Sequence, residues 1–199
     1  FRQRDGHETG SDGSNHGTGR ARTAADPEDV KATSVLAKIG WNYNDDDRLA
    51  FCPLQFLETK GDRAWAMEWI DTILALNGVN TTPAQRNEIG NAIMSMHASG
   101  ARPLSEFSVT IQDEAIREAI KQYTVDGSMG HLLDAEEDGL SLSDFTVFEI
   151  EELMNLGEKF ALPVLLYLFR RIERALKGPP SVIILDEAWL MLGHPAFRA

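Results

Sequence analysis

The sequence has almost no cysteine and no long apolar run. Cys52 is the single cysteine among 199 residues, which excludes an internal disulfide framework and a zinc site built from four cysteines. The longest apolar stretch, residues 160–169, is interrupted by Pro163 and falls far short of the ~20 residues that a membrane-spanning helix needs. The first residues carry no apolar signal core. We therefore expect a protein of the reducing cytoplasm.

Basic residues are scarce compared with acidic ones. The chain has 19 Lys and Arg against 31 Asp and Glu, which gives a formal net charge of -12 at pH 7. This balance repels a phosphate backbone, and the basic residues do not gather into a patch. The composition thus argues against direct, electrostatically driven binding of nucleic acid, while a hydrophobic share of 43% is enough for the core of one domain.

Large apolar residues are also nearly absent from the first part of the chain. Residues 1–44 consist mainly of Gly, Ser, Asp, His, Thr and Arg. Such a segment buries too little apolar surface to offset an ordering cost of ~1–2 kcal/mol per residue. We expect residues 1–44 to be a disordered or unrelated Gly- and Arg-rich segment, and residues 45–199 to form the folded domain.

Three apolar stripes at helical spacing open the folded domain. Helix starts are marked by a capping box at Thr82 and Gln85 with Pro83 at the first helical position, and more weakly by Thr110 and Asp113. Three successive helices without an intervening strand predict a helical insertion. The stripes are Trp65, Trp69, Ile73 and Leu76; Ile89, Ile93 and Met96; and Ile116, Ile120 and Tyr123.

The last third alternates strand and helix patterns. Residues 145–150 are rich in β-branched and aromatic side chains and predict a strand, and residues 162–176 predict a long helix. Residues 181–185, Ser-Val-Ile-Ile-Leu, have the pattern of a parallel strand buried on both faces. A shorter apolar run at residues 49–52 is compatible with a strand end. A strand, a helix and a strand form a βαβ unit, so we predict an α/β fold with parallel strands.

Two carboxylates, Asp186 and Glu187, follow the apolar strand directly. Ligands of open parallel sheets bind beyond the carboxyl ends of the strands, and four aliphatic residues before Asp-Glu form the Walker B pattern of P-loop ATPases. Asp186 would hold Mg²⁺ with its ATP, because a hard cation prefers oxygen ligands. Glu187 would help to bind the nucleotide and would orient the attacking water as general base. The alternative is a strand that ends in acidic residues because it has reached solvent.

A longer pattern around these carboxylates resembles a known family. Residues 145–199, including Ile-Ile-Leu-Asp-Glu-Ala-Trp-Leu-Met-Leu, are similar to the motor domain of the conjugation and type IV secretion ATPases, the group that holds CagE and the VirB ATPase component. The resemblance extends back through residues 51–57 to about residue 45. It implies a RecA-like P-loop core with a helical insertion, Mg-ATP hydrolysis, homo-oligomers and contact with other secretion components. It also implies docking at the cytoplasmic face of the inner membrane, where the family drives pilus assembly and substrate transfer.

The chain departs from this family in its phosphate loop. The run Gly-x-x-x-x-Gly-Lys-Ser/Thr, whose amides cradle phosphates, does not occur in the sequence, and its nearest approximation at residues 13–21 has Arg20 in place of the lysine. We therefore expect a partial motor domain, from a truncated or frameshifted reading frame or from a deliberately partial sequence, that does not hydrolyse ATP alone. The alternative function is a non-catalytic module that associates with a secretion complex.

Two further charged groups have alternative interpretations. Arg170, Arg171 and Arg174 lie on the predicted long helix. Arg174 is our candidate for a catalytic arginine supplied to a neighbouring subunit's ATP, and the alternative is a solvated helix face near the negative end of the helix dipole. The acidic stretch 134–138 lacks the glycine and terminal glutamate of a calcium loop, which favours a solvated loop over a cation site.

Overall fold

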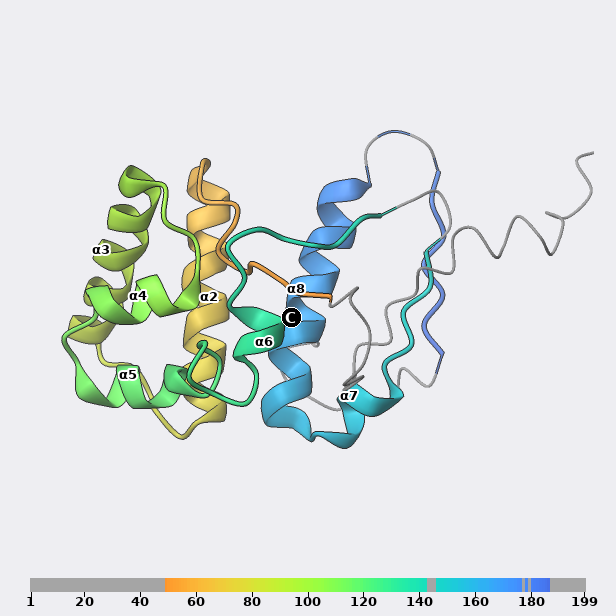
Figure 1. Ribbon diagram of the computed structural model, residues 1–199. Coiled ribbons are helices and arrows are strands. Elements are labelled where there is room, and N and C mark those ends of the chain that lie inside the picture. Colours follow the sequence, from red (N-terminus) through yellow and green to blue (C-terminus); the bar gives the residue numbers. More distant parts are fainter. Residues whose placement is uncertain (1–48, 143–145, 177, 179, 187–199) are drawn as a thin grey trace, which may run out of the picture.

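A computed structural model describes residues 49–142, 146–176, 178 and 180–186 of the chain. The regular elements within these ranges are helices (Figure 1). The predicted Gly- and Arg-rich segment and the approximate phosphate loop at residues 13–21 lie outside the described residues. The helices are α2 (Lys60–Leu76), α3 (Pro83–Ser99), α4 (Leu104–Thr110), α5 (Glu114–Lys121), α6 (Gly130–Leu133), α7 (Glu151–Asn155) and α8 (Glu158–Ala175).

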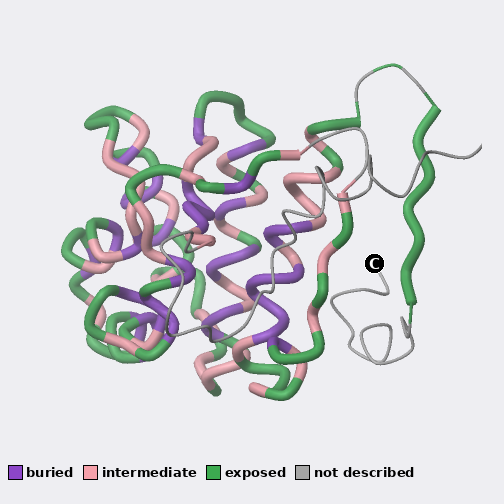
Figure 2. The backbone as a smooth tube through the Cα atoms, turned by 45° about the vertical axis from the view of Figure 1, so that its right-hand side comes forward, coloured by how far each residue is buried: buried purple, intermediate pink, exposed green. Residues whose placement is uncertain are grey.

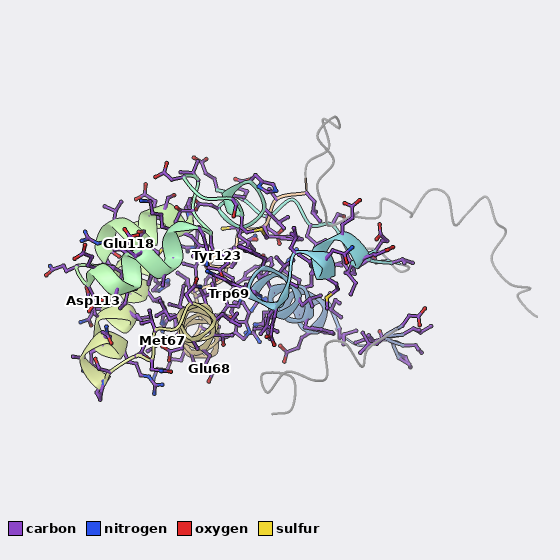
Figure 3. The ribbon with its side chains drawn as sticks, turned by 90° about the horizontal axis from the view of Figure 1, so that it is seen from below. Met67, Glu68, Trp69, Asp113, Glu118 and Tyr123 are labelled. Atoms are coloured by element: carbon purple, nitrogen blue, oxygen red, sulfur yellow. The ribbon has the colours of Figure 1, made fainter. Side chains whose placement is uncertain are left out.

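Helix α2 lies at the centre of the molecule. It packs against α3 and α5 on one side and against α8 on the other, while α4 bridges α3 and α5 (Figure 1). The predicted stripes supply much of the core, since Trp69, Ile73 and Ile93 are almost completely buried. In Figure 2 the buried residues gather where these helices meet. Viewed from below, Trp69 and Tyr123 lie in the interior, whereas Glu118 of α5 lies toward the edge (Figure 3).

Capping interactions explain where the helices begin. The predicted capping box of α3 is confirmed: the Thr82 hydroxyl accepts from the Gln85 amide at 3.3 Å and Pro83 occupies the first turn. The predicted start of the next helix at Thr110 is wrong, because Thr110 ends α4 and its hydroxyl donates to the Phe107 carbonyl at 2.7 Å. Helix α5 begins instead at Asp113, whose carboxylate accepts from the Ile116 amide at 3.1 Å.

Helix α8 begins four residues before its predicted start, and Pro163 lies inside it. A proline has no amide hydrogen, so the carbonyl of Lys159 has no partner within the helix. The hydroxyl of Tyr123 donates to that carbonyl at 2.8 Å. The indole Nε1 of Trp69 donates to the carbonyl of Pro163 itself at 2.9 Å. Side chains from outside the helix therefore bond carbonyls of α8 at both positions.

The predicted strands do not form within the described residues. In the run at 49–52, Phe51 and Cys52 are buried, but Phe51 donates from its amide to the carbonyl of Leu132 at 2.7 Å and accepts from the Ala135 amide at 3.2 Å, so α6 and the loop after it take the place of a neighbouring strand. Residues 146–150 contain only an isolated bridge at Glu149. Residues 181–185 are exposed rather than buried on both faces (Figure 2). A parallel strand needs neighbours, and the described residues supply none, so the α/β class stays a prediction.

Candidate functional site

Asp186 is the last described residue of the predicted Walker B pair. It lies exposed at the end of residues 180–186, which run back along the molecule after α8 (Figure 1). Glu187 lies outside the described residues. Across the part of the chain that the structure describes, no three His, Cys, Asp or Glu side chains lie together so that they could hold a metal ion. Of the predicted Walker B pair, the described residues thus include Asp186 alone, and the magnesium site stays a prediction.

Arg174 is held by contacts within the chain. Its guanidinium pairs with the carboxylate of Asp62 and lies over the ring of Phe56, with 4.0 Å between the guanidinium carbon and the ring centroid. Arg170 pairs with the same carboxylate at 2.9 Å and with Glu173 at 2.8 Å. The alternative of a solvated helix face is therefore wrong for these two arginines. A role for Arg174 at a neighbouring subunit's ATP stays a prediction, and it would require Arg174 to leave Asp62.

Asp62 joins the start of α2 to the end of α8. Its side chain is 3% exposed, and it accepts hydrogen bonds from the backbone amide and the hydroxyl of Thr59 at 3.2 and 2.7 Å. Burial pushes the pKa of this carboxyl upward, but the Thr59 hydrogen bonds and the two arginines outweigh it and hold the pKa below its usual value. Asp62 is therefore an ionised group that closes the capping box of α2 and fixes α8 against it.

A second buried carboxylate, Asp138, fixes the middle of α8. It pairs with Arg171 at 2.5 Å, accepts from the Tyr167 hydroxyl at 2.7 Å, and has a fully buried side chain. Burial and the Asp138 charge raise the pKa of Tyr167 well above its usual range. The predicted solvated loop at 134–138 is therefore wrong at this position, and also at Asp134, which accepts from the Ser105 amide at 2.9 Å.

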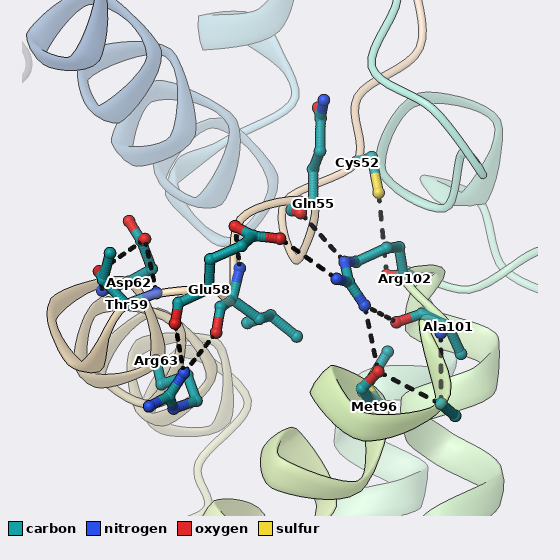
Figure 4. Close-up of polar contacts among 11 residues, drawn as sticks. Cys52, Gln55, Glu58, Thr59, Asp62, Arg63, Met96, Ala101 and Arg102 are labelled. Carbon is teal, nitrogen blue, oxygen red and sulfur yellow. Dashed lines mark hydrogen bonds and ion pairs between the residues drawn. The ribbon is translucent and has the colours of Figure 1, made fainter.

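Two arginines, Arg63 and Arg102, form hydrogen bonds with the loop that leads into α2 (Figure 4). Arg63 donates to the carbonyls of Leu57 and Glu58 at 2.6 and 2.9 Å. Arg102 donates to the carbonyl of Gln55 at 3.0 Å and pairs with the Glu58 carboxylate at 3.3 Å. The sequence patterns did not predict Asp62, Arg63 or Arg102 as structural residues. Of these, only Asp62 carried a local signal, since Thr59 and Asp62 have the spacing of a capping box.

An apolar groove of about 400 Å³ runs along the outer side of α8. Trp65 lines one wall, and its ring stacks on that of Trp69 with 6.1 Å between centroids. Ile183 of the segment before Asp186 lines it as well. The remaining apolar lining residues are Leu166, Phe169 and Ile172 of α8 and Leu176, which follows the end of that helix. No described helix combines the length and apolar character needed to cross a membrane.

Comparison with known proteins identifies the class to which this chain is related. No family model matches the sequence. The type IV secretion system protein VirB4 of Bartonella quintana is 26% identical over 154 residues, which cover 74% of this chain and 20% of VirB4. The chain is thus related to a segment of a type IV secretion system protein.

Higher similarity connects the chain with TrbE. A probable conjugal transfer protein of Sinorhizobium fredii, named as one of the parts of TrbE, is 57% identical over 160 residues, which cover 80% of this chain and 24% of that protein. The conjugal transfer protein TrbE of Rhizobium radiobacter is 59% identical over 154 residues, or 77% of this chain and 19% of that protein. The chain is therefore similar, over most of its own length, to segments of TrbE proteins, which confirms the predicted resemblance, and it spans about a fifth to a quarter of these relatives' length.

Proposed function

We propose that the chain is a segment of an ATP-hydrolysing motor that energises conjugal transfer through a type IV secretion system. The observation that carries this proposal is the identity of 57% and 59% to two proteins named for conjugal transfer. The aliphatic run that ends in Asp186 and Glu187 supports the ATPase activity, because it is the Walker B pattern. The whole motor would have the RecA-like α/β core, in which residues 181–185 are a strand.

In this proposal Asp186 contributes an oxygen ligand to Mg²⁺ and Glu187 orients the attacking water. The bound Mg-ATP supplies the phosphoryl group that is transferred to water. A carboxylate on an exposed segment suits the first role, since Mg²⁺ keeps several waters and takes few protein ligands. The phosphate loop is missing from all 199 residues, so the phosphate-binding half of the site belongs to another region of the motor.

The same similarity extends the proposal to partners and location. We propose that the intact motor forms homo-oligomers, contacts other type IV secretion components and works at the cytoplasmic face of the inner membrane. The relationship to VirB4, which is named as a type IV secretion system protein, supports an association with that machinery. The net charge of -12 argues against direct recognition of the transferred nucleic acid by this segment.

A chimera tests the proposed function. The 154 residues of Rhizobium radiobacter TrbE that match this chain are replaced by the corresponding residues of the chain, and Mg-ATP hydrolysis and conjugal transfer from a donor strain without TrbE are measured. We expect both activities in the chimera. Asp186→Asn and Glu187→Gln should each lower hydrolysis at least ~100-fold. Glu137→Gln, which changes an exposed carboxylate, is the matched control and should have no effect. Full hydrolysis in both Walker B variants would refute the assigned roles.

The missing phosphate loop favours a second candidate, a non-catalytic interaction module. A ligand at 100 times its Kd stabilises a protein by ~2.7 kcal/mol, so Mg-ATP binding to the chain alone would raise its melting temperature. Both candidates predict no shift for the isolated chain. They differ in the chimera: the module should restore assembly of the secretion complex without any effect of Asp186→Asn on hydrolysis or transfer.

A further inference from the structure

The apolar groove beside α8 brings together two parts of the chain that are distant in sequence. Among the residues that line it, Trp65 comes from α2 and Ile183 from the segment before Asp186, while the others belong to α8 or follow its end directly. In this groove a side chain of the central helix α2 therefore lies beside the segment that carries the predicted Walker B carboxylates.

The ring of Trp65 is held by several neighbours. It stacks on Trp69 with 6.1 Å between the ring centroids and lies 6.3 Å from the ring of Tyr167. The guanidinium of Arg170 lies 5.7 Å from the Trp65 ring centroid, and Arg170 is itself paired with Asp62 at 2.9 Å. A tryptophan side chain has only two torsions, so it loses little conformational entropy when it is held in this way. Trp65 thus forms a rigid wall of the groove.

The exposure of the segment indicates which of its side chains turn toward the groove. Val182 and Ile184 are each 86% exposed, whereas Ile183 and Leu185 are 49% and 46% exposed. This alternation is the period of an extended chain, in which successive side chains point to opposite faces. Ile183 accordingly lines the groove, and Asp186 follows three residues later, a span of about 10 Å in an extended chain.

We propose that Trp65 is a positioning residue for Asp186: its ring is the wall on which Ile183 rests, and this contact fixes the place of the carboxylate. The inference rests on the proposed function, in which Asp186 is a ligand of Mg²⁺. A functional side chain has to be held within about 0.5 Å of its productive position. Contact between Ile183 and a rigid ring gives the exposed segment a fixed point three residues before that carboxylate.

The neighbouring Trp69 shows how a tryptophan of the core differs from Trp65. Trp69 is 2% exposed and donates its indole N–H to the carbonyl of Pro163 at 2.9 Å, so it serves the packing of α2 against α8. Trp65 is only partly buried and lines the groove. Its position therefore suits contact with Ile183 in addition to packing.

Spin labelling of the isolated chain tests the contact itself. Ile184→Cys carries a nitroxide on the exposed face of the segment, and the native Cys52 is buried, so it does not react in the folded chain. We expect the broad EPR spectrum of a restrained label. Trp65→Ala and Ile183→Ala should each sharpen the spectrum, and the two substitutions together should add little, because each removes the same contact.

Control variants separate positioning from general packing. Trp65→Phe keeps an aromatic wall and should keep the broad spectrum. Met67→Ala is the matched control on the same helix, since the Met67 methyl lies 3.4 Å from the place of a Cβ on Gly90 and thus packs toward α3; it should leave the spectrum unchanged. Ile183→Ala changes only the exposed segment, so it gives the result even where Trp65→Ala destabilises the helices.

Mn²⁺ binding connects the contact with the carboxylate. In the chimera with Rhizobium radiobacter TrbE, the Mn²⁺ that binds together with ADP is titrated by EPR, which requires no hydrolysis. We expect Asp186→Asn and Trp65→Ala each to weaken binding ~10-fold, the effect of disturbing a group that orients a metal ligand. Trp65→Phe and Met67→Ala should leave the affinity for Mn²⁺ unchanged.

Unchanged EPR spectra in Trp65→Ala and Ile183→Ala would overturn the proposal, and so would a label at residue 184 that is fully mobile in the otherwise native chain. Mn²⁺ binding that is weakened by Asp186→Asn but not by Trp65→Ala would also overturn it, and would leave the proposed function standing. If Asp186→Asn has no effect on Mn²⁺ while Trp65→Ala mobilises the label, the role of Asp186 at Mg²⁺ is refuted and the contact between Trp65 and Ile183 stands.

Discussion

The charge of Asp62 should contribute strongly to the stability of the chain, and Asp62→Asn removes it with little change of shape. The amide oxygen of asparagine can still accept from the Thr59 backbone amide, so the capping box is partly retained. The ion pairs with Arg170 and Arg174 are lost. The variant therefore isolates the electrostatic tie between α2 and α8.

The burial of the ion pairs determines how much stability Asp62→Asn should lose. Breaking a buried ion pair costs about 3–5 kcal/mol. The two arginine side chains are 18% and 33% exposed, so water partly solvates them after the substitution, and we expect ~3 kcal/mol. Asp71→Asn is the matched control on the same helix. Asp71 pairs with Arg86 at 3.3 Å, but that arginine is 61% exposed, so the expected loss is below ~1 kcal/mol.

The pKa of Asp62 predicts how its contribution to the stability of the fold changes with pH. The folded state holds the pKa of Asp62 below its usual value, so the carboxylate stabilises the fold above the unfolded pKa of ~3.9. This contribution is lost as the pH falls through the folded pKa. Urea unfolding of the full chain at pH 7 and at steps below pH 4 should show a gap between wild type and Asp62→Asn that narrows with acid. A gap no larger than that of Asp71→Asn, or one independent of pH, would refute the reasoning.

Three further perturbations test the packing. Tyr123→Phe leaves the Lys159 carbonyl without its donor and should cost ~1–3 kcal/mol in urea unfolding; an unchanged midpoint would contradict the assigned bond. Gly130→Ala places a Cβ against the backbone of Thr124 and should lower the free energy of unfolding by ~2 kcal/mol. The control Gly61→Ala in α2, where a Cβ would lie 3.7 Å from the Thr59 hydroxyl, should leave stability unchanged or raise it. Equal losses of stability in the two variants would argue against the close approach of Gly130 to Thr124. Burial and the Asp138 charge raise the pKa of Cys52 to about 12, so iodoacetamide at pH 8 should modify it only after unfolding, and rapid modification of the native chain would disprove that burial.

Local patterns predicted α2 and α3, and α5 and α8 with misplaced starts, whereas the short helices α4, α6 and α7 were not predicted. The capping box at Thr82 and the buried stripe of Ile89 and Ile93 involve residues within a few turns of each other, so periodicity and capping rules suffice to find them. The start of α8 was misplaced because Pro163 weakens a helix pattern. Its compensation by Tyr123 comes from 36 residues away and leaves no mark in the neighbouring sequence.

The charged network of α8 could not be predicted, because its partners are distant in the chain. Asp62 and Arg174 are separated by 112 residues, and a helix with three arginines has the same sequence whether those arginines face water or a buried carboxylate. The predicted strand at 181–185 depends on neighbours that the described residues do not contain. Its carboxylates, Asp186 and Glu187, remain a prediction for the same reason.

The hydrogen bonds around Pro163 also determine how motion can pass through the molecule. The Tyr123 hydroxyl bonds one carbonyl of α8 and the Trp69 indole bonds another four residues on. A slide of α8 by one turn past α2 would place different carbonyls opposite both donors and leave the Lys159 oxygen without a partner beside a proline that cannot replace it. These two hydrogen bonds therefore fix the position of α8 along its axis relative to the side chains of Tyr123 and Trp69. A displacement of residues 180–186 that pulls on α8 should therefore move Trp69 and Tyr123 together with the helix rather than slide the helix past them.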